Sequence, residues 1–167
     1  MGEIERRLAD MGLTLPPPMP ALPGVRLPFA LVQRHGSRVL FSGHGPQAPD
    51  GGIHPVRGKL GAELNVEEGY EAARQVALSV LGSLQRELGS LDRIGRWTKV
   101  LGMVNCMPGF FEQPAVINGF SDLIISLWGH ERGAHVRSAV GMAQLPFNIP
   151  VEVEGELELL TTAGRYV

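Results

Sequence analysis

The residue with the clearest chemical potential is Arg137, which begins a predicted strand whose next side chains on the same face are all small. Those neighbours are Ala139, Gly141 and Ala143. A face this small lets a ligand, another chain or a helix approach the backbone closely. An arginine at the edge of such a hollow can bind a carboxylate through two parallel hydrogen bonds. The same spacing also fits an ordinary surface arginine paired with an acid, so both interpretations stay open.

A row of glutamates occupies one face of the last predicted strand, residues 151–159. The strand alternates strictly between apolar residues and Glu152, Glu154, Glu156 and Glu158. Such a row is typical of a solvated sheet face. A glutamate at the inner end could instead activate water, because a general base must stand near its target and often has a raised pKa. The pattern alone does not choose among the four.

Other motifs of known chemistry are incomplete. Residues 43–48 imitate a dinucleotide fingerprint, but a turn follows where a helix must begin. The stretch from Gly52 to Lys59 has five residues between its glycines, whereas a P-loop has four. His130 and His135 are five residues apart in a glycine-containing loop and do not share a helix face. We therefore expect neither a cofactor nor a metal.

Two long helices carry the strongest local signals. Asn65 and Glu68 predict a capping box at the start of the first helix, and Gly89 suits its end. The second helix is predicted to begin at Pro114 and to end at Gly129. Apolar residues recur at helical spacing through both segments.

The strand signals complete an α+β domain. We expect a buried strand at 39–41 closed by Ser42-Gly43, a strand at 94–104 covered on both faces, and final strands at 137–145 and 151–159. In chain order this gives β-β-α-β-α-β-β. The prediction is a mixed β-sheet with two helices packed on one face.

The length of 167 residues argues for one domain. Residues 1–24 are interpreted as an N-terminal extension, with a short helix that ends near Gly12 and a proline-rich segment after it. Residues 25–160 would form the domain, and residues 161–167 a C-terminal tail.

Charge and composition exclude several classes of protein. The net charge is −2, from 15 basic and 17 acidic residues, which gives no electrostatic footprint for nucleic acid. No apolar run approaches the ~18 residues of a membrane span, and the charged N-terminus is unlike a signal peptide. The single cysteine, Cys106, excludes an internal disulfide and is expected to be buried. These observations favour a cytoplasmic protein.

A family resemblance enters with the C-terminal motifs. Arg137 to Pro146, followed by Val151 to Glu154, resembles the signature of the Rid (YjgF-like) family, often described as L-PSP endoribonuclease-like. Similar segments elsewhere are Phe41-Ser42-Gly43, Val116 to Gly119, and Val66 to Arg74, the last resembling a longer, mostly uncharacterised subgroup. The resemblance implies a chorismate-mutase-like α+β fold. It also implies a homotrimer with three clefts between subunits.

The family includes imine and enamine deaminases, which hydrolyse a 2-imino acid or its enamine tautomer to a 2-oxo acid and ammonia without a cofactor. By resemblance, Arg137 would bind the substrate carboxylate. Glu152 would position or activate water beside the backbone carbonyl of Ala139. Other cleft positions would be Phe29, Ser42, Gly43 and Asn118.

Three positions depart from the family pattern. Phe29 stands where the deaminases carry tyrosine, His44 where glutamine is common, and Gly141 where a larger, often acidic residue is found. The predicted carboxylate clamp is retained, but one hydroxyl is missing. Two functions follow as hypotheses: a deaminase-type hydrolase, and a non-catalytic metabolite-binding trimer. The net charge and the lack of a basic stripe disfavour a third, an endoribonuclease.

Overall fold

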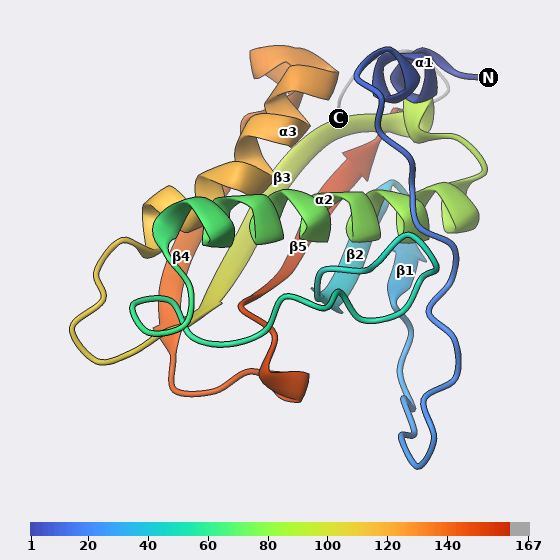
Figure 1. The fold of residues 1–167 in the computed structure, drawn as a ribbon. Helices are drawn as coiled ribbons and strands as arrows, with labels where there is room; N and C mark the ends of the chain where they lie inside the picture. The colour runs from blue at the N-terminus through green and yellow to red at the C-terminus, as the bar shows by residue number, and fades with distance from the viewer. Residues whose placement is uncertain (161–167) are drawn as a thin grey trace.

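The computed structural model describes residues 1–160, which form a five-stranded sheet with two long helices across one face (Figure 1). The strand order is β1-β2-β5-β3-β4; β3 and β4 are parallel and the other pairs antiparallel. This confirms the predicted α+β class and the order of elements. The expected C-terminal tail, residues 161–167, lies outside the described residues. The strands are β1 Val32–His35, β2 Arg38–His44, β3 Ile94–Asn105, β4 Val136–Met142 and β5 Val151–Leu159.

Helix α2, Val66–Leu88, begins and ends where the sequence predicts. The Asn65 side chain accepts from the Glu68 amide, and the Glu68 side chain accepts from the Asn65 amide, each at 2.9 Å. Gly89 closes the helix with φ of 81°, a left-handed conformation that glycine adopts without strain.

Helix α3, Gln113–Gly133, starts as expected, and its regular part ends at Gly129 as predicted. Gly129 has φ of 75° and interrupts the helix, after which the chain makes one more helical turn to Gly133. The Arg132 side chain donates to the carbonyl oxygens of Ile94 and Gly95, which ties this turn to β3. The predicted end of the regular helix at Gly129 is therefore confirmed, and a tertiary contact supports the extra turn, which the sequence did not predict.

The core lies between the two helices and the sheet. Trp97 on β3 is 1% exposed and makes edge-to-face contacts with Phe41, Phe120 and Trp128. Gly102, also on β3, has no Cβ, and the Ile117 side chain of α3 occupies the space that one would need. This close approach seats α3 on the centre of the sheet.

No helix of residues 1–160 covers the opposite face of the sheet (Figure 1). Strand β3 was predicted to be covered on both faces, and in the single chain this is wrong. Val100 and Val104 point into the core, whereas Lys99 is exposed and Leu101 and Met103 are partly exposed. We call this second surface the open face.

The N-terminal extension packs against the rest of the chain. Helix α1, Glu3–Asp10, buries Ile4 and Leu8, and the Asp92 carboxylate accepts hydrogen bonds from the amides of its first residues. Asp92 belongs to a short 3-10 helix at Leu91–Arg93; a second such helix spans Pro146–Asn148. No helix among residues 1–160 is long and apolar enough to cross a membrane.

Candidate active site

Arg137, on the edge strand β4, lies half-buried against α3. Its Nη1 donates to Asn118 Oδ1 and Ser121 Oγ, both at 3.0 Å, and its Nη2 donates to the Pro114 carbonyl at 3.4 Å. These bonds use three of the five N–H groups of a guanidinium. The remaining two, on Nε and Nη2, have no acceptor within residues 1–160, and such a pair matches the two oxygens of a carboxylate.

The charge of Arg137 is not paired with an acid in the described part of the chain. Burial lowers the pKa of Arg137, and the negative charge of Asp122 acts against that shift. Asp122 itself accepts a hydrogen bond from the Tyr70 hydroxyl at 3.0 Å. Arg137 is therefore a partly desolvated cation held by neutral acceptors, the arrangement that an anionic ligand requires.

One of the small residues after Arg137, Gly141, leaves space that neighbouring side chains of the same chain fill. A Cβ at Gly141 would stand 2.8 Å from Cys106 Sγ and 2.9 Å from Gln113 Nε2. Ala139 packs against the core. Cys106 is buried, as the sequence predicts. At Gly141, the close approach comes from the end of β3 and the start of α3.

Glu152 lies on the open face, on the opposite side of the sheet from Arg137. Gly102 of β3 pairs with Ala139 of β4 and with Val153 of β5. Paired residues point to the same face of a sheet, so Arg137 and Ala139 share a face with the buried Val153. Glu152 stands beside Met103 and points the other way. Burial, followed by the nearby charge of Glu154, raises the pKa of the Glu152 carboxyl.

The Glu152 side chain packs against a β-bulge in β2. The pairing of β2 with β5 shifts register between Phe41 and His44, so that Ser42 and Gly43 form a bulge. The Glu152 Oε1 atom occupies the space that a Cβ at Gly43 would need. Only glycine admits the carboxylate in this position.

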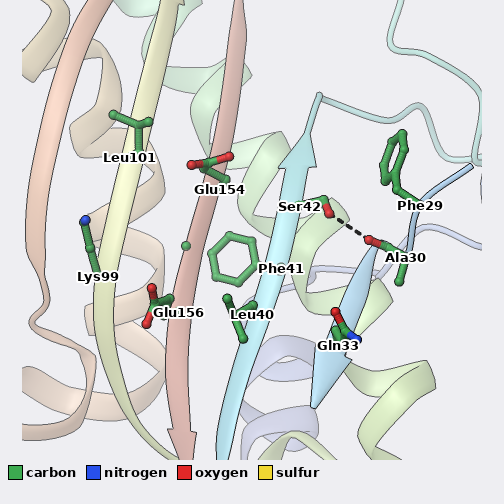
Figure 2. Close-up of a pocket in the computed structure, with 11 residues that line it drawn as sticks. Phe29, Ala30, Gln33, Leu40, Phe41, Ser42, Lys99, Leu101, Glu154 and Glu156 are labelled. Carbon is green, nitrogen blue, oxygen red and sulfur yellow. Dashed lines mark hydrogen bonds between the residues drawn. The ribbon is translucent and has the colours of Figure 1, made fainter. Parts of the chain in front are cut away.

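A pocket of about 380 Å³ opens on the same face (Figure 2). Phe29, 54% exposed, lies at one side of it, and the Ser42 hydroxyl donates to the Ala30 carbonyl at 2.7 Å. Across the pocket stand Lys99 of β3 and Glu154 of β5. Glu156 also lines it but is bonded to Arg38 at 2.6 Å.

His44 anchors the bulge from the buried side. Its Nδ1 lies 2.6 Å from the Ser42 carbonyl and its Nε2 lies 3.0 Å from Ser83 Oγ. Burial is the largest influence on the pKa of His44 and lowers it; the Ser42 carbonyl opposes this and the charge of Arg86 adds to it. A neutral imidazole donating to the Ser42 carbonyl fits both observations.

The predicted site residues thus fall into two groups in the single chain. Phe29, Ser42, Gly43 and Glu152 lie on the open face, whereas Arg137, Asn118 and Ala139 lie on the helix side near the β4 edge. Strand β3 separates β5 from β4, so the single chain does not bring Arg137 and Glu152 together. Sequence reasoning missed Lys99 and Ser121; for Ser121 the signal was its position one helical turn after Asn118.

The mixed sheet, with its helices on one face and an arginine at its edge strand, defines an α+β protein of the chorismate-mutase-like class. A family model described as "YjgF/chorismate mutase-like, putative endoribonuclease" matches residues 5–154. The chain belongs to this family, which confirms the resemblance first seen in its C-terminal motifs.

Similar proteins cover nearly the whole chain. Protein TCP17 of Trypanosoma cruzi is 43% identical over 158 residues, which make up 95% of both proteins. The crystal structure of Atu1372 from Agrobacterium tumefaciens, described as of unknown function, is 37% identical with a TM-score of 0.82 over 94% of this chain and 92% of that one. A "putative endoribonuclease" of Shewanella oneidensis MR-1 is 30% identical with a TM-score of 0.83, over 95% of this chain and all of its own.

Proposed function

We propose that this protein is a hydrolase of small 2-imino acids or their enamine tautomers, which releases ammonia and a 2-oxo acid. The observation that carries the proposal is Arg137: a half-buried guanidinium with three neutral acceptors and a pair of unused N–H groups. A planar, two-pronged donor of this kind recognises a carboxylate. Membership of the family supports the same assignment.

The chemistry needs one further group, a base for water. In the proposed reaction, Arg137 fixes the carboxylate and thereby the adjacent imine carbon. Glu152 takes a proton from water as the water oxygen bonds to that carbon, and the proton is returned to nitrogen. This gives a tetrahedral carbinolamine. Glu152 then transfers the proton of its hydroxyl group to the nitrogen, the C–N bond breaks, ammonia leaves, and the carbonyl of the 2-oxo acid forms. The raised pKa of Glu152 suits a carboxylate that must accept and return a proton.

The two halves of the site require a second copy of the chain. We propose a homotrimer in which the Arg137 side of one subunit meets the Ser42, Gly43 and Glu152 side of the next. The opposite faces of the sheet on which these residues lie support this arrangement. So does an apolar run that alternates along the extended segment before β1 and is exposed in the single chain: Val25, Leu27, Phe29 and Leu31.

A non-catalytic trimer that binds small carboxylate metabolites is the second candidate. The observation favouring it is Phe29, which brings a ring without a hydroxyl to the open-face pocket. In this alternative Arg137 still binds the carboxylate, but Glu152 takes no part in proton transfer. Neither candidate calls for nucleic acid or a cofactor.

The decisive experiment measures ammonia release from 2-iminopropanoate generated in place by an amino acid oxidase. The proposal predicts that the protein accelerates the release and that Arg137→Ala abolishes the acceleration. Arg74→Ala, which removes an arginine bonded to Glu71 on the exposed side of α2, is the matched control and should behave as the unsubstituted protein. Carboxylate binding without acceleration, beside an active control enzyme, would establish the binding module instead.

A further inference from the structure

A chain of hydrogen bonds extends from Arg137 into the protein. Arg137 Nη1 donates to Ser121 Oγ at 3.0 Å, and Ser121 Oγ lies 3.0 Å from His135 Nε2. The other ring nitrogen, Nδ1, lies 2.8 Å from the Gly133 carbonyl. Ser121 is 8% exposed, and the His135 ring packs edge-to-face on Phe120 at 6.3 Å between ring centroids.

The direction of each hydrogen bond in this chain follows from the Gly133 carbonyl together with the protonation state of the His135 ring. A carbonyl oxygen can only accept, so His135 Nδ1 must carry a hydrogen. Burial is the largest influence on the pKa of His135 and lowers it, and the charge of Arg137 adds to this, which favours the neutral ring. Nε2 of the neutral ring then accepts the hydrogen of the Ser121 hydroxyl. With that hydrogen committed to His135, Ser121 can offer Arg137 only its lone pairs. The hydroxyl is thus held as an acceptor for the guanidinium.

We propose that Ser121 and His135 are positioning residues that hold the Arg137 guanidinium in the orientation required to bind a substrate carboxylate. The inference rests on the proposed function and adds two residues to its binding site. The Asn118 bond fixes one Nη1 hydrogen, and the Ser121 bond fixes the other. Together they prevent rotation of the guanidinium plane and leave the Nε and Nη2 edge available.

The same pattern occurs between β2 and α2. Arg86 Nη2 donates to Ser83 Oγ at 3.0 Å, Ser83 Oγ lies beside His44 Nε2, and His44 Nδ1 lies beside the Ser42 carbonyl. There too a neutral histidine, bonded to a carbonyl, fixes a serine as an acceptor for arginine. The two chains of bonds support the two halves of the proposed cleft, one through Arg137 and one through Ser42.

The test compares the binding of 2-oxobutanoate with that of its uncharged amide in the full-length protein. Ser121→Ala and His135→Phe should each raise the Kd for 2-oxobutanoate about tenfold, the factor expected when a hydrogen bond to a charged group is lost. Neither should change the weak binding of the amide. Ser121→Thr keeps the hydroxyl and should restore the affinity.

Two further measurements separate positioning from general stability. In turnover assays, Ser121→Ala should raise KM far more than it lowers kcat. Ser126→Ala serves as the control, since this exposed hydroxyl of α3 donates only to the Leu123 carbonyl of its own helix. It should leave Kd and KM unchanged. If Ser121→Ala and His135→Phe lower the melting temperature but bind 2-oxobutanoate as the unsubstituted protein does, the inference is overturned.

A readout without ligand distinguishes failure of this inference from failure of the proposed function. The Nη1 hydrogens of Arg137 should give slowly exchanging NMR signals in the unsubstituted protein that vanish in Ser121→Ala. If the signals vanish in Ser121→Ala but the unsubstituted protein neither binds nor converts 2-oxo or 2-imino acids, the proposed function is rejected and the positioning role of Ser121 is supported. Signals unchanged by Ser121→Ala would reject the positioning whatever the activity.

Discussion

The Glu152 carboxylate lies over Gly43, with its Oε1 atom in the space that any other residue would fill with a Cβ. The contact joins β5 to the bulge of β2 on the open face of the sheet. Gly43 therefore permits the bulge and also leaves space for the Glu152 carboxylate. It determines where the proposed base of the reaction can stand.

Gly43→Ala should reduce turnover with little loss of stability. The added methyl group meets the end of a flexible side chain rather than backbone, so Glu152 can move aside. Displacement of a catalytic group by about 1 Å can cost on the order of 100-fold in rate. Steady-state kinetics and thermal melting measure the two effects. Gly52→Ala, next to the flexible Asp50 side chain, is the control and should keep full activity.

Glu152→Gln should remove most of the turnover, on the order of 10²- to 10⁴-fold, while 2-oxobutanoate still binds. Gln keeps the shape of the side chain but cannot take a proton from water. Loss of carboxylate binding in this variant, measured by calorimetry, would contradict the assignment of separate roles to Glu152 and Arg137.

Glu152 should also make stability and activity depend on pH in opposite directions. Its pKa is raised in the fold, so the folded state binds this proton more tightly than the unfolded chain. The contribution of Glu152 to the free energy of unfolding is therefore greatest at low pH and is lost as the pH rises through the folded-state pKa. The melting temperature of Glu152→Gln should therefore rise relative to that of the unsubstituted protein as the pH increases above the ordinary glutamate range, about pH 4. Turnover should instead fall as acid protonates Glu152.

Arg137→Lys tests whether the two-pronged shape of the guanidinium matters beyond its charge. Lysine keeps the positive charge but offers a single point donor, and it cannot bond Asn118, Ser121 and a carboxylate at once. We expect KM to rise at least about tenfold, the equivalent of one lost charge-assisted hydrogen bond. Kinetics with KM equal to that of the unsubstituted protein would show that charge alone suffices.

Gly119→Ala should destabilise the protein through the contact between α2 and α3. A Cβ at Gly119 would collide with the backbone carbonyl of Tyr70, which cannot move aside as a side chain can. Overpacking of this kind costs about 1–3 kcal/mol, measurable by urea denaturation. Ser126→Ala on the exposed side of α3 is the control. Tyr70 donates a hydrogen bond to Asp122, and the charge of Asp122 acts on Arg137. We therefore expect carboxylate binding at Arg137 to weaken as well.

Local signals in the sequence predicted local structure well. The capping box of Asn65 and Glu68 and the left-handed Gly89 fix both ends of α2, because these residues act on their own neighbours. Gly129 ends the regular part of α3 as predicted, but nothing in the sequence indicated the further turn that the bonds of Arg132 to β3 support.

The arrangement of the site depends on contacts between distant segments, and the sequence did not reveal it. Alternation showed that Arg137 and Ala139 share a face, and that the four glutamates share another. Only the pairing of β3 with both β4 and β5 shows that these are opposite faces of one sheet. His135 looked like a loop histidine, because its partner Ser121 is reached only when α3 packs beside β4.

The most direct test of the account mixes two inactive variants. Arg137→Ala and Glu152→Gln subunits, unfolded together and refolded as mixed oligomers, should regain turnover of 2-iminopropanoate. If each cleft takes Arg137 from one subunit and Glu152 from the next, random assembly of equal amounts makes about one quarter of the clefts intact. Mixed oligomers, verified by copurification through a tag on one variant, that show no more activity than the separate variants would contradict the account.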